Sequence, residues 1–338
     1  MSEPARTWLV TGGCGFIGVN LVRALSGRGE AVRVFDDLSG GDRASLGEVV
    51  KFVERSGPGA LRAGEVELLM GDVRDRVSVR RAMAGAGVVV HLAAQTGVIS
   101  SIENPLKDFE VNSLGLLNVL AAAKDAAAAH VVFASSNAPL GDGPSGADES
   151  TPARPVSPYG ASKLSGEGYC SAFAGSYGLA TTVLRFANAY GPFSRRKGSV
   201  VAHYAKGALA GEPLVIYGDG SQTRDFVHVD DLVQAISLAV DRSRPGELYQ
   251  IASGRETTVL ELARKIRALA IRDLGRPIEI VHEPARAGEV LRSGPRIDKA
   301  RRELGYQPQV DFESGVEDVW NWYARGAVET RAPGGGRP

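Results

Sequence analysis

The chain has 338 residues, of which 43% are hydrophobic and 23% charged, a composition typical of a globular protein with one large or two ordinary domains. Its 39 lysine and arginine residues equal its 39 aspartate and glutamate residues, which argues against nucleic acid or an anionic membrane as the main partner. No apolar run approaches the roughly 18 residues of a membrane span, and residues 1–8 lack the apolar core of a signal peptide. The two cysteines are Cys14 and Cys170, and Cys14 lies in a glycine-rich turn, a poor place for a disulfide. The sequence therefore predicts a protein of the reducing cytoplasm.

A glycine-rich turn near the N-terminus follows the first predicted strand, residues 7–10, and precedes a helix predicted from Phe16. Gly12 allows a tight strand-to-helix turn, Gly15 lets a pyrophosphate approach the backbone, and Gly18 lets helix and strand pack closely. The helix N-terminus then directs free N–H groups and its positive dipole end at the phosphates. The pattern predicts a dinucleotide site rather than a plain glycine turn.

The second predicted strand, residues 31–35, ends in Asp36 and Asp37. An acid about 20 residues after the glycine turn is placed to accept hydrogen bonds from a ribose. No arginine directly follows Asp36, which favours NAD over NADP.

Short apolar strands alternate with helices as far as residue 186. Further strands are expected at 66–70, 88–93, 130–133 and 181–186, and helices at 106–127 and 159–177. This alternation predicts an α/β fold with a doubly wound parallel sheet, in which ligands bind at the carboxyl ends of the strands.

The alternation stops after residue 192, and a smaller, partly discontinuous α/β domain is expected to hold the substrate. Strands are expected there at 214–217 and 278–281, and helices at 230–240 and 259–269. We assign residues 1–186 and about 223–243 to the dinucleotide-binding domain, about 187–222 and 244–328 to the substrate domain, and 329–338 to a disordered tail.

A candidate catalytic pair lies on the predicted helix 159–177. Tyr159 and Lys163 are four residues apart and share one face of the helix. A free tyrosine has a pKa of about 10, and a nearby ammonium lowers that pKa by favouring the phenolate. Ser136, at the end of the fifth strand, supplies a hydroxyl that can share the proton taken from a substrate alcohol. Such a pair is common on surface helices and by itself is seldom catalytic, and the alternative for Ser135 and Ser136 is that they merely end a strand.

Five segments occur in the order typical of one family: TGGCGFIG at 11–18, HLAA at 91–94, SS at 135–136, YGASK at 159–163 and LRF at 184–186. Together they resemble the extended short-chain dehydrogenase/reductases, in the nucleotide-sugar epimerase/dehydratase branch, over about residues 7–325.

The resemblance implies a Rossmann fold and a bound NAD. The implied cofactor-binding residues are Gly12, Gly15, Phe16, Ile17 and Gly18 around the pyrophosphate, Asp36 and Asp37 at the adenosine ribose, Asp72 and Val73 at the adenine, and Leu92, Ala93 and Ala94 at the end of the fourth strand. Tyr159 is then the base, Lys163 holds the nicotinamide ribose, and Ser136 binds the reacting sugar hydroxyl. The implied site contains no metal.

The same resemblance implies a nucleotide-diphosphate sugar as substrate. Its expected contacts are Asn137 beside Ser136, Asn188 in RFANAYGP, Tyr217 and Arg224 in YGDGSQTRDF, Arg286 in RAGE, and Arg195, which falls where uronic-acid-specific members place an arginine. Arginine suits a diphosphate because its fork binds two oxygens at once. The alternative is that these are ordinary salt-bridging surface arginines.

Departures from the family pattern point to the reaction. Dehydratases and decarboxylases of this branch carry acids where this chain has Asn137 and Ala138, and neither residue supplies a proton at neutral pH. Epimerisation needs no such acid, so we expect an NAD-dependent UDP-hexose or UDP-hexuronate 4-epimerase.

Several alternatives remain open. They are a CDP-sugar-type 2-epimerase, which residues 95–112 also resemble, a decarboxylase or other sugar-nucleotide oxidoreductase, and a non-catalytic NAD-binding regulator. The resemblance also implies a homodimer, formed through the helices at 106–127 and 159–177.

Overall fold

The computed structural model describes residues 6–142, 146–285 and 291–331. An eight-stranded sheet lies at its centre, with the strand order β11-β7-β6-β5-β1-β2-β4-β3 and every neighbouring pair parallel. Its strands are β1 (Thr7–Thr11), β2 (Ala31–Asp36), β3 (Val53–Arg55), β4 (Val66–Met70), β5 (Ala86–His91), β6 (His130–Ser136), β7 (Thr181–Phe186) and β11 (Glu247–Ile251). The predicted doubly wound α/β fold is confirmed.

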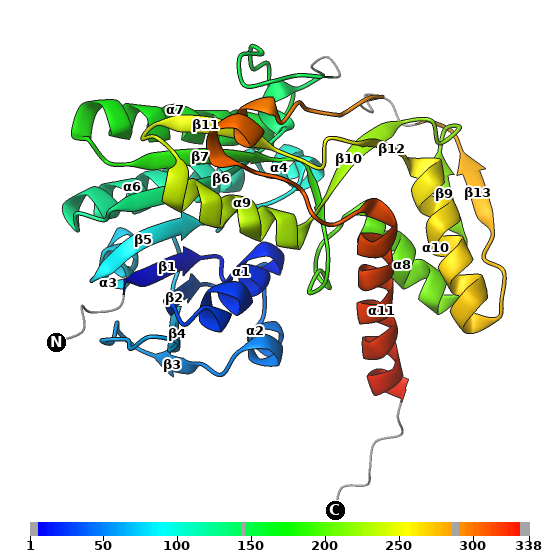
Figure 1. Ribbon diagram of the computed structural model, residues 1–338, viewed down its shortest axis with the longest axis horizontal. Helices are drawn as coiled ribbons and strands as arrows, with labels where there is room; N and C mark the ends of the chain where they lie inside the picture. The colour runs from blue at the N-terminus through cyan, green and yellow to red at the C-terminus, as the bar shows by residue number, and fades with distance from the viewer. Residues whose placement is uncertain (1–5, 143–145, 286–290, 332–338) are drawn as a thin grey trace, which may run out of the picture.

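Helices cover both faces of this sheet (Figure 1). One face packs against α1 (Phe16–Gly27), α2 (Arg43–Val49) and α9 (Val229–Arg242), and the other against α3 (Arg76–Ala82), α6 (Gly115–Asp125) and α7 (Pro158–Tyr177). The strands are apolar on both sides: Val10 faces the α1 and α9 layer, whereas its neighbour Leu9 faces the α6 and α7 layer.

A smaller region with its own core lies to one side, on the right of Figure 1. It contains a three-stranded sheet of β8 (Asn188–Tyr190), β10 (Thr223–His228) and β12 (Glu256–Thr258), and a two-stranded sheet of β9 (Leu214–Tyr217) and β13 (Ile280–Glu283). Three helices pack on them: α8 (Val200–Ala210), α10 (Val259–Leu274) and α11 (Phe312–Arg331). The side chain of Trp320 is fully buried in this second core.

The boundary between the two regions differs from the expected one in two places. β11 pairs with β7 and closes one edge of the central sheet, although residues from 244 onward were expected in the smaller domain. β10 pairs with β8 and β12 rather than with the central sheet, and only the following helix, α9, packs on that sheet. Strand pairing is a contact between distant segments, so a short apolar run does not reveal its partner.

The helix expected at 106–127 is interrupted. The chain forms α4 (Val98–Glu103), α5 (Pro105–Asp108), a π-helix η1 (Phe109–Leu114) and then α6. Asn104 caps α5 by accepting a hydrogen bond from the backbone N–H of Lys107 at 3.1 Å.

The expected tail is also only partly correct, because α11 continues to Arg331. The rest of the predicted tail, 332–338, lies outside the described residues. No helix within the described part of the chain is long and apolar enough to cross a membrane.

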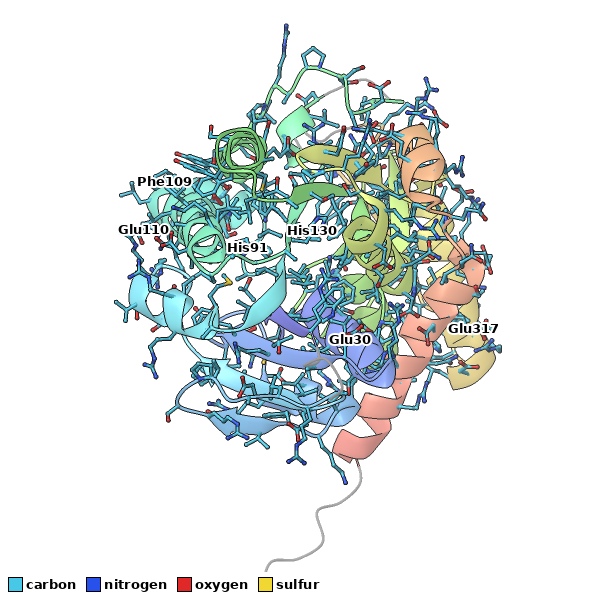
Figure 2. All side chains as sticks on the ribbon, turned by 60° about the vertical axis from the view of Figure 1, so that its left-hand side comes forward. Glu30, His91, Phe109, Glu110, His130 and Glu317 are labelled. Carbon is cyan, nitrogen blue, oxygen red and sulfur yellow. The ribbon has the colours of Figure 1, made fainter. Side chains whose placement is uncertain are left out.

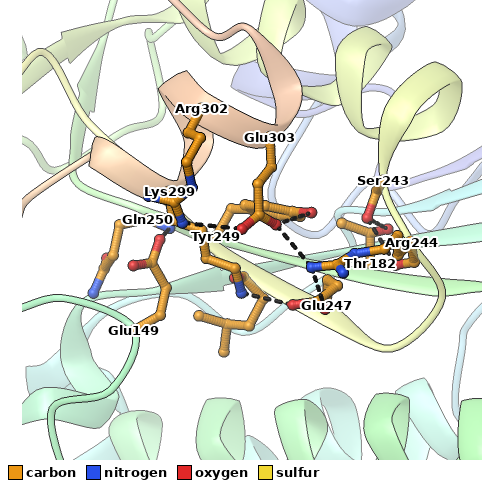
Figure 3. Close-up of polar contacts among 11 residues, drawn as sticks. Glu149, Thr182, Ser243, Arg244, Glu247, Tyr249, Gln250, Lys299, Arg302 and Glu303 are labelled. Atoms are coloured by element: carbon orange, nitrogen blue, oxygen red, sulfur yellow. Dashed lines mark hydrogen bonds and ion pairs between the residues drawn. The ribbon is translucent and has the colours of Figure 1, made fainter.

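The exposed edge of the central sheet is covered by a charged network (Figure 3). Lys299 Nζ, just before the π-helix η3 (Ala300–Leu304), donates to a Glu247 carboxylate oxygen at 2.7 Å and to the Leu248 carbonyl at 2.8 Å. The Gln250 N–H donates to Glu149 Oε1 at 2.7 Å. These contacts cover β11, an edge strand that could otherwise pair with another chain. The bond to Glu149 also holds the loop that comes after β6 and after the short 3-10 helix η2 (Ala138–Leu140).

Candidate active site

The glycine turn between β1 and α1 has the geometry expected of a phosphate-binding loop. Gly12 has φ +71°, and a Cβ there would lie 2.6 Å from the Ala93 nitrogen. A Cβ on Gly18 would lie 2.3 Å from the Gly12 carbonyl oxygen, so helix and strand pack too closely for a side chain.

Gly15 is different, because a Cβ there would meet one neighbouring atom, Gly12 O at 3.3 Å, among the described residues. The fold itself hardly requires a glycine at this position, whereas a pyrophosphate lying against the loop does. Gly15 is also the N-cap of α1, and its lack of a side chain leaves the first N–H groups without a side-chain cap. The loop therefore fits the diphosphate of a dinucleotide.

Asp36 lies at the end of β2 and faces this loop. Its carboxylate accepts hydrogen bonds from the Cys14 N–H at 2.9 Å and the Leu38 N–H at 2.7 Å. Burial raises the pKa of Asp36, and the two backbone donors oppose that rise. A carboxylate has about four lone-pair positions, so two remain for ribose hydroxyls. Asp37, in contrast, is exposed and accepts hydrogen bonds from Ser39 within its own turn.

The other expected cofactor contacts line the same edge of the sheet. Leu92, Ala93 and Ala94 follow β5 and are half-buried, and the Ala93 N–H donates to Thr11 Oγ1 at 3.3 Å. Val73 is buried. Asp72 binds Arg74 at 2.6 Å, and this hydrogen-bonded guanidinium lowers the pKa of Asp72. These residues lie at the carboxyl ends of β1, β2, β4 and β5, the edge at which a sheet of this type binds a dinucleotide.

The structure brings Ser136, Tyr159 and Lys163 together where β6 meets the start of α7. Ser157 caps α7 by accepting a hydrogen bond from the Gly160 N–H at 3.1 Å, which places Tyr159 in the first turn. Lys163 is 4% exposed, and its Nζ donates to the Ala134 carbonyl at 2.8 Å. The same Nζ lies 5.9 Å from the centroid of the Tyr159 ring.

Burial dominates the electrostatics of this group. It raises the pKa of Tyr159, and a hydrogen bond with Ser136 lowers that pKa by a smaller amount. It lowers the pKa of Lys163 to about 8, although Asp108 and Glu167 raise it. The sequence predicted that Lys163 lowers the pKa of Tyr159. In the structure burial raises the pKa of Tyr159, the hydrogen bond that opposes this rise comes from Ser136, and the ammonium of Lys163 is held by the Ala134 carbonyl.

Two buried polar groups that sequence reasoning missed hold α7 against its neighbours. One turn after Lys163, Glu167 accepts two hydrogen bonds from Arg185 of β7, at 2.8 and 2.6 Å, and one from Ser135 at 2.6 Å. On another side, Ser162 donates to Asp108 at 2.6 Å. The signal for Glu167 was its four-residue spacing from Lys163, the same as between Lys163 and Tyr159.

The position after Ser136 carries no acid. Asn137 is half-buried, and its side-chain oxygen has no hydrogen-bond partner among the described residues. Ala138 begins the 3-10 helix η2 and carries only a methyl group. These two side chains contain no proton donor that titrates near neutral pH.

The expected substrate contacts come from the smaller region. Asn188 is exposed on β8 and pairs with Phe226, two residues after Arg224 on β10. Arg224 is half-buried, with its Nη1 donating to the Thr223 carbonyl at 2.8 Å, and Tyr217 ends β9. Arg286 lies outside the described residues.

Arg195 is already engaged by the protein. Its guanidinium binds Glu48 of α2 at 2.7 Å and lies 4.5 Å from the centroid of the Trp322 ring. Lys197, two residues later, was missed by sequence reasoning: its Nζ lies 4.8 Å from the ring centroid of Phe16, the first residue of α1. Burial lowers the pKa of Lys197 to about 8.

Comparisons with known proteins agree with this geometry. The family model described as "NAD dependent epimerase/dehydratase family" matches residues 8–252. The UDP-glucose 4-epimerase of Mycolicibacterium smegmatis is 35% identical over 313 residues, which cover 91% of this chain and 95% of that protein.

Two solved structures have the same fold over nearly their whole length. The UDP-glucose 4-epimerase of Thermotoga maritima, solved with UDP-glucose, has a TM-score of 0.85 and 33% identity, covering 95% of this chain and 99% of that chain. The dTDP-glucose 4,6-dehydratase of Streptomyces venezuelae, solved with NAD, has a TM-score of 0.82 and 33% identity, covering 96% and 98%. This chain therefore belongs to the NAD-dependent epimerase/dehydratase family of nucleotide-sugar enzymes, and NAD is its cofactor.

Proposed function

We propose that the protein is a nucleotide-sugar 4-epimerase that acts on a UDP-hexose or a UDP-hexuronate. The observation that carries this proposal is the meeting of Ser136, Tyr159 and Lys163 beside the cofactor loop, with Asn137 and Ala138 in place of further acids. The similarity to epimerases over more than nine-tenths of the chain supports it.

When bound, NAD supplies a reversible hydride acceptor at the sugar carbon that bears the reacting hydroxyl. The chain's own residues handle the proton of that hydroxyl. Ser136 holds the hydroxyl, the phenolic oxygen of Tyr159 takes its proton, and the charge of Lys163 favours the phenolate that this requires. After the keto sugar has rotated in the site, the hydride returns to its opposite face and Tyr159 returns the proton. The sugar and the cofactor end at their starting oxidation states, so the overall reaction is redox-neutral.

The side chains at 137 and 138 favour epimerisation over dehydration. Loss of water from a keto sugar requires an acid for the departing hydroxyl and a base for the carbon-bound proton. The carboxamide of Asn137 and the methyl group of Ala138 supply neither.

The remaining assignments are part of the same proposal. In this proposal the residues at the carboxyl edge of the sheet, from Gly12 to Ala94, bind the cofactor together with Tyr159 and Lys163, and the smaller region binds the nucleotide sugar. In this proposal Asn188, Tyr217, Arg224 and Arg286 contact the nucleotide diphosphate, and Asn137 and Arg195 the sugar. Both cysteines are free and buried, which fits a reducing cytoplasm.

We further propose that the protein is a homodimer. Several large apolar side chains are exposed on the consecutive elements α4, α5 and η1: Ile99, Ile102, Leu106 and Phe109 are 70%, 60%, 74% and 58% exposed. Figure 2 shows Phe109 at the outer edge of this helical layer. A patch of this kind on a folded protein marks an interaction surface. Sedimentation or light scattering tests the dimer, and a monomer at micromolar concentration contradicts it.

The activity test uses the purified protein with UDP-glucose, UDP-glucuronate, dTDP-glucose and a CDP-sugar, each in a separate reaction. We expect the 4-epimer of a UDP-sugar without growth of the absorbance of reduced nicotinamide. A 2-epimer, a 4-keto-6-deoxy product, release of carbon dioxide or accumulation of reduced nicotinamide identifies one of the alternative enzymes. Bound NAD with no product from any sugar identifies a non-catalytic regulator.

A further inference from the structure

A buried carboxylate, Asp108, lies next to the catalytic helix at the point where the helical backbone changes its winding. Asp108 ends α5 and is 1% exposed, and the π-helix η1 begins at the next residue. π-turns inside helices are rare and frequently accompany functional sites. The interruption lies between α5 and α6, in the layer that packs against α7.

Three hydrogen bonds hold the Asp108 carboxylate in place. Ser162 Oγ donates to Oδ2 at 2.6 Å, and Asn112 Nδ2 donates to Oδ1 at 3.0 Å and to Oδ2 at 3.2 Å. Ser162 lies between Tyr159 and Lys163 on α7. Asn112 also joins the backbone of Gln95, accepting from its N–H at 2.9 Å and donating to its carbonyl at 3.0 Å. Asp108 accepts all three of these hydrogen bonds, and a carboxylate without a proton can act only as an acceptor.

The charges around Lys163 do not balance without Asp108. Two buried carboxylates, Asp108 and Glu167, favour the charged form of Lys163. Glu167 already forms a bidentate ion pair with the buried Arg185. The hydrogen-bond partners of Asp108 among the described residues are neutral. Because an isolated buried charge is costly, Asp108 is the carboxylate left to offset the charge of Lys163 through space.

We propose that Asp108 is a positioning residue of the catalytic pair: held by Ser162 and Asn112, its carboxylate keeps Lys163 charged inside the protein and so sets the pH range of activity. The proposal rests on the proposed role of Tyr159 and Lys163 in the epimerase reaction. Asp108 disfavours the phenolate of Tyr159 at the same time. The carboxylate of Asp108 therefore acts to raise the pKa of Lys163 and the pKa of Tyr159 together.

The other ionisable groups near Lys163 do not change charge over the working range. On β5, burial and then Lys163 lower the pKa of His91 to about 3, so its imidazole is neutral. On α7, burial raises the pKa of the Cys170 thiol above the working range. Glu167 on α7 accepts two hydrogen bonds from Arg185 on β7, so each of these residues supplies the other's counter-charge. Asp108 is thus the one remaining charge facing the pair among the described residues.

The first experiment measures kcat/KM against pH for the NAD-loaded protein and for Asp108→Asn. Loss of a negative charge lowers the pKa of a neighbouring lysine and of a neighbouring tyrosine, so both limbs of the profile should move to lower pH by about 0.5–1 unit. The matched control is Glu110→Gln, two residues away and exposed on the outer side of η1 (Figure 2), which should leave both limbs in place. Ser162→Ala loses a bond to Asp108 but no charge, so its rate should fall with a smaller shift.

A second experiment does not depend on turnover. Titration of tyrosinate absorbance in the NAD-loaded protein, with the Tyr159→Phe spectrum subtracted, gives the midpoint for Tyr159, and Asp108→Asn should lower it by a similar amount. If the wild type turns over no sugar, the proposed function fails while this midpoint still tests Asp108. Unchanged limbs and an unchanged midpoint in a folded Asp108→Asn overturn the proposal, as does a shift to higher pH. Should this variant not fold, Asp108→Ser carries the same expectation.

Discussion

In the region built on the eight-stranded sheet, two charged residues of α7 are buried and bonded to the protein: Lys163 to Ala134, and Glu167 to Arg185. In the smaller region, Asn188 is exposed and Arg224 is half-buried. Folding itself offsets the free energy needed to remove Lys163 and Glu167 from water. These groups are therefore oriented before any ligand binds. The second set retains contact with solvent, and we expect its full ordering when the nucleotide sugar binds.

The difference suggests that the region built on the eight-stranded sheet carries out the chemical step and that the smaller region recognises the substrate. A change in the first region should alter the rate of the chemical step or the stability of the fold, whereas a change in the second should alter substrate affinity. The following variants test this division, from the largest expected effect to the smallest.

Tyr159→Phe should reduce kcat by about 1,000-fold or more, because a positioned proton-transfer group contributes roughly 10²–10⁴-fold. The ring remains, so the melting temperature and the NAD that co-purifies should not change. Kinetics on the accepted sugar and the absorbance of the extracted cofactor measure both quantities. Full activity in this variant would sink the proposed mechanism.

Glu167→Gln should lower the free energy of unfolding by about 3–5 kcal/mol, because it leaves the buried Arg185 guanidinium without its counter-charge. Urea unfolding measures the change. Glu54→Gln is the matched control, since Glu54 pairs with Arg43 in an exposed ion pair whose loss should leave the free energy of unfolding almost unchanged. Equal losses in the two variants would contradict the burial argument.

Gly15→Ala should weaken NAD binding by at least about tenfold with little loss of stability, because the added methyl group lies where the pyrophosphate approaches. Gly18→Ala should instead destabilise the fold, by about 1–3 kcal/mol, because its methyl group meets the Gly12 carbonyl. Calorimetric titration with NAD and thermal melts distinguish the two effects. Unchanged NAD affinity in Gly15→Ala would remove this glycine from the cofactor site.

Arg224→Ala should raise KM for the nucleotide sugar by about 10–100-fold, the effect of losing a charge-assisted hydrogen bond, with NAD affinity unchanged. The comparison between regions predicts a smaller change in kcat than in KM. Steady-state kinetics tests it, with Arg23→Ala, an exposed arginine on α1, as control. A fall in kcat alone would place Arg224 in the chemistry instead.

The smallest effect is the pH dependence of the wild type. Lys163 is charged below its pKa of about 8, so the alkaline limb of kcat/KM should begin near that pH, with a fall of up to tenfold per unit above it. In Lys163→Arg the guanidinium stays protonated, so activity should be lower but without this decline. A flat profile to pH 10 in the wild type would show that Lys163 does not titrate as proposed.

The sequence was sufficient to predict features that depend on local geometry. Gly12 and Gly18 follow from the turn and the close helix packing, and Tyr159 and Lys163 from their spacing on one helix. Features that depend on a distant partner were wrong or missed. Glu48, the partner of Arg195, lies 147 residues away, and β11 pairs with a strand that precedes it by about 65 residues.

The π-helix η1 shows the same limit within a helix. Residues 106–114 contain neither glycine nor proline, so their pattern predicts an uninterrupted helix. The change of winding accompanies contacts outside the segment, from Asn112 to Gln95 and from Asp108 to Ser162. Helix periodicity carries no information about such partners.

The buried pair of Glu167 and Arg185 has a consequence for how this sequence can change over time. The pair anchors α7 one turn beyond Lys163, so the part of the helix that carries Tyr159 is fixed independently of its far end. Exposed residues in the last two turns, such as Tyr177, can then change without disturbing the catalytic pair, whereas Phe173 stays packed in the core. Engineers can likewise redesign that end, for instance to attach a label or a new contact surface, while leaving the chemistry intact.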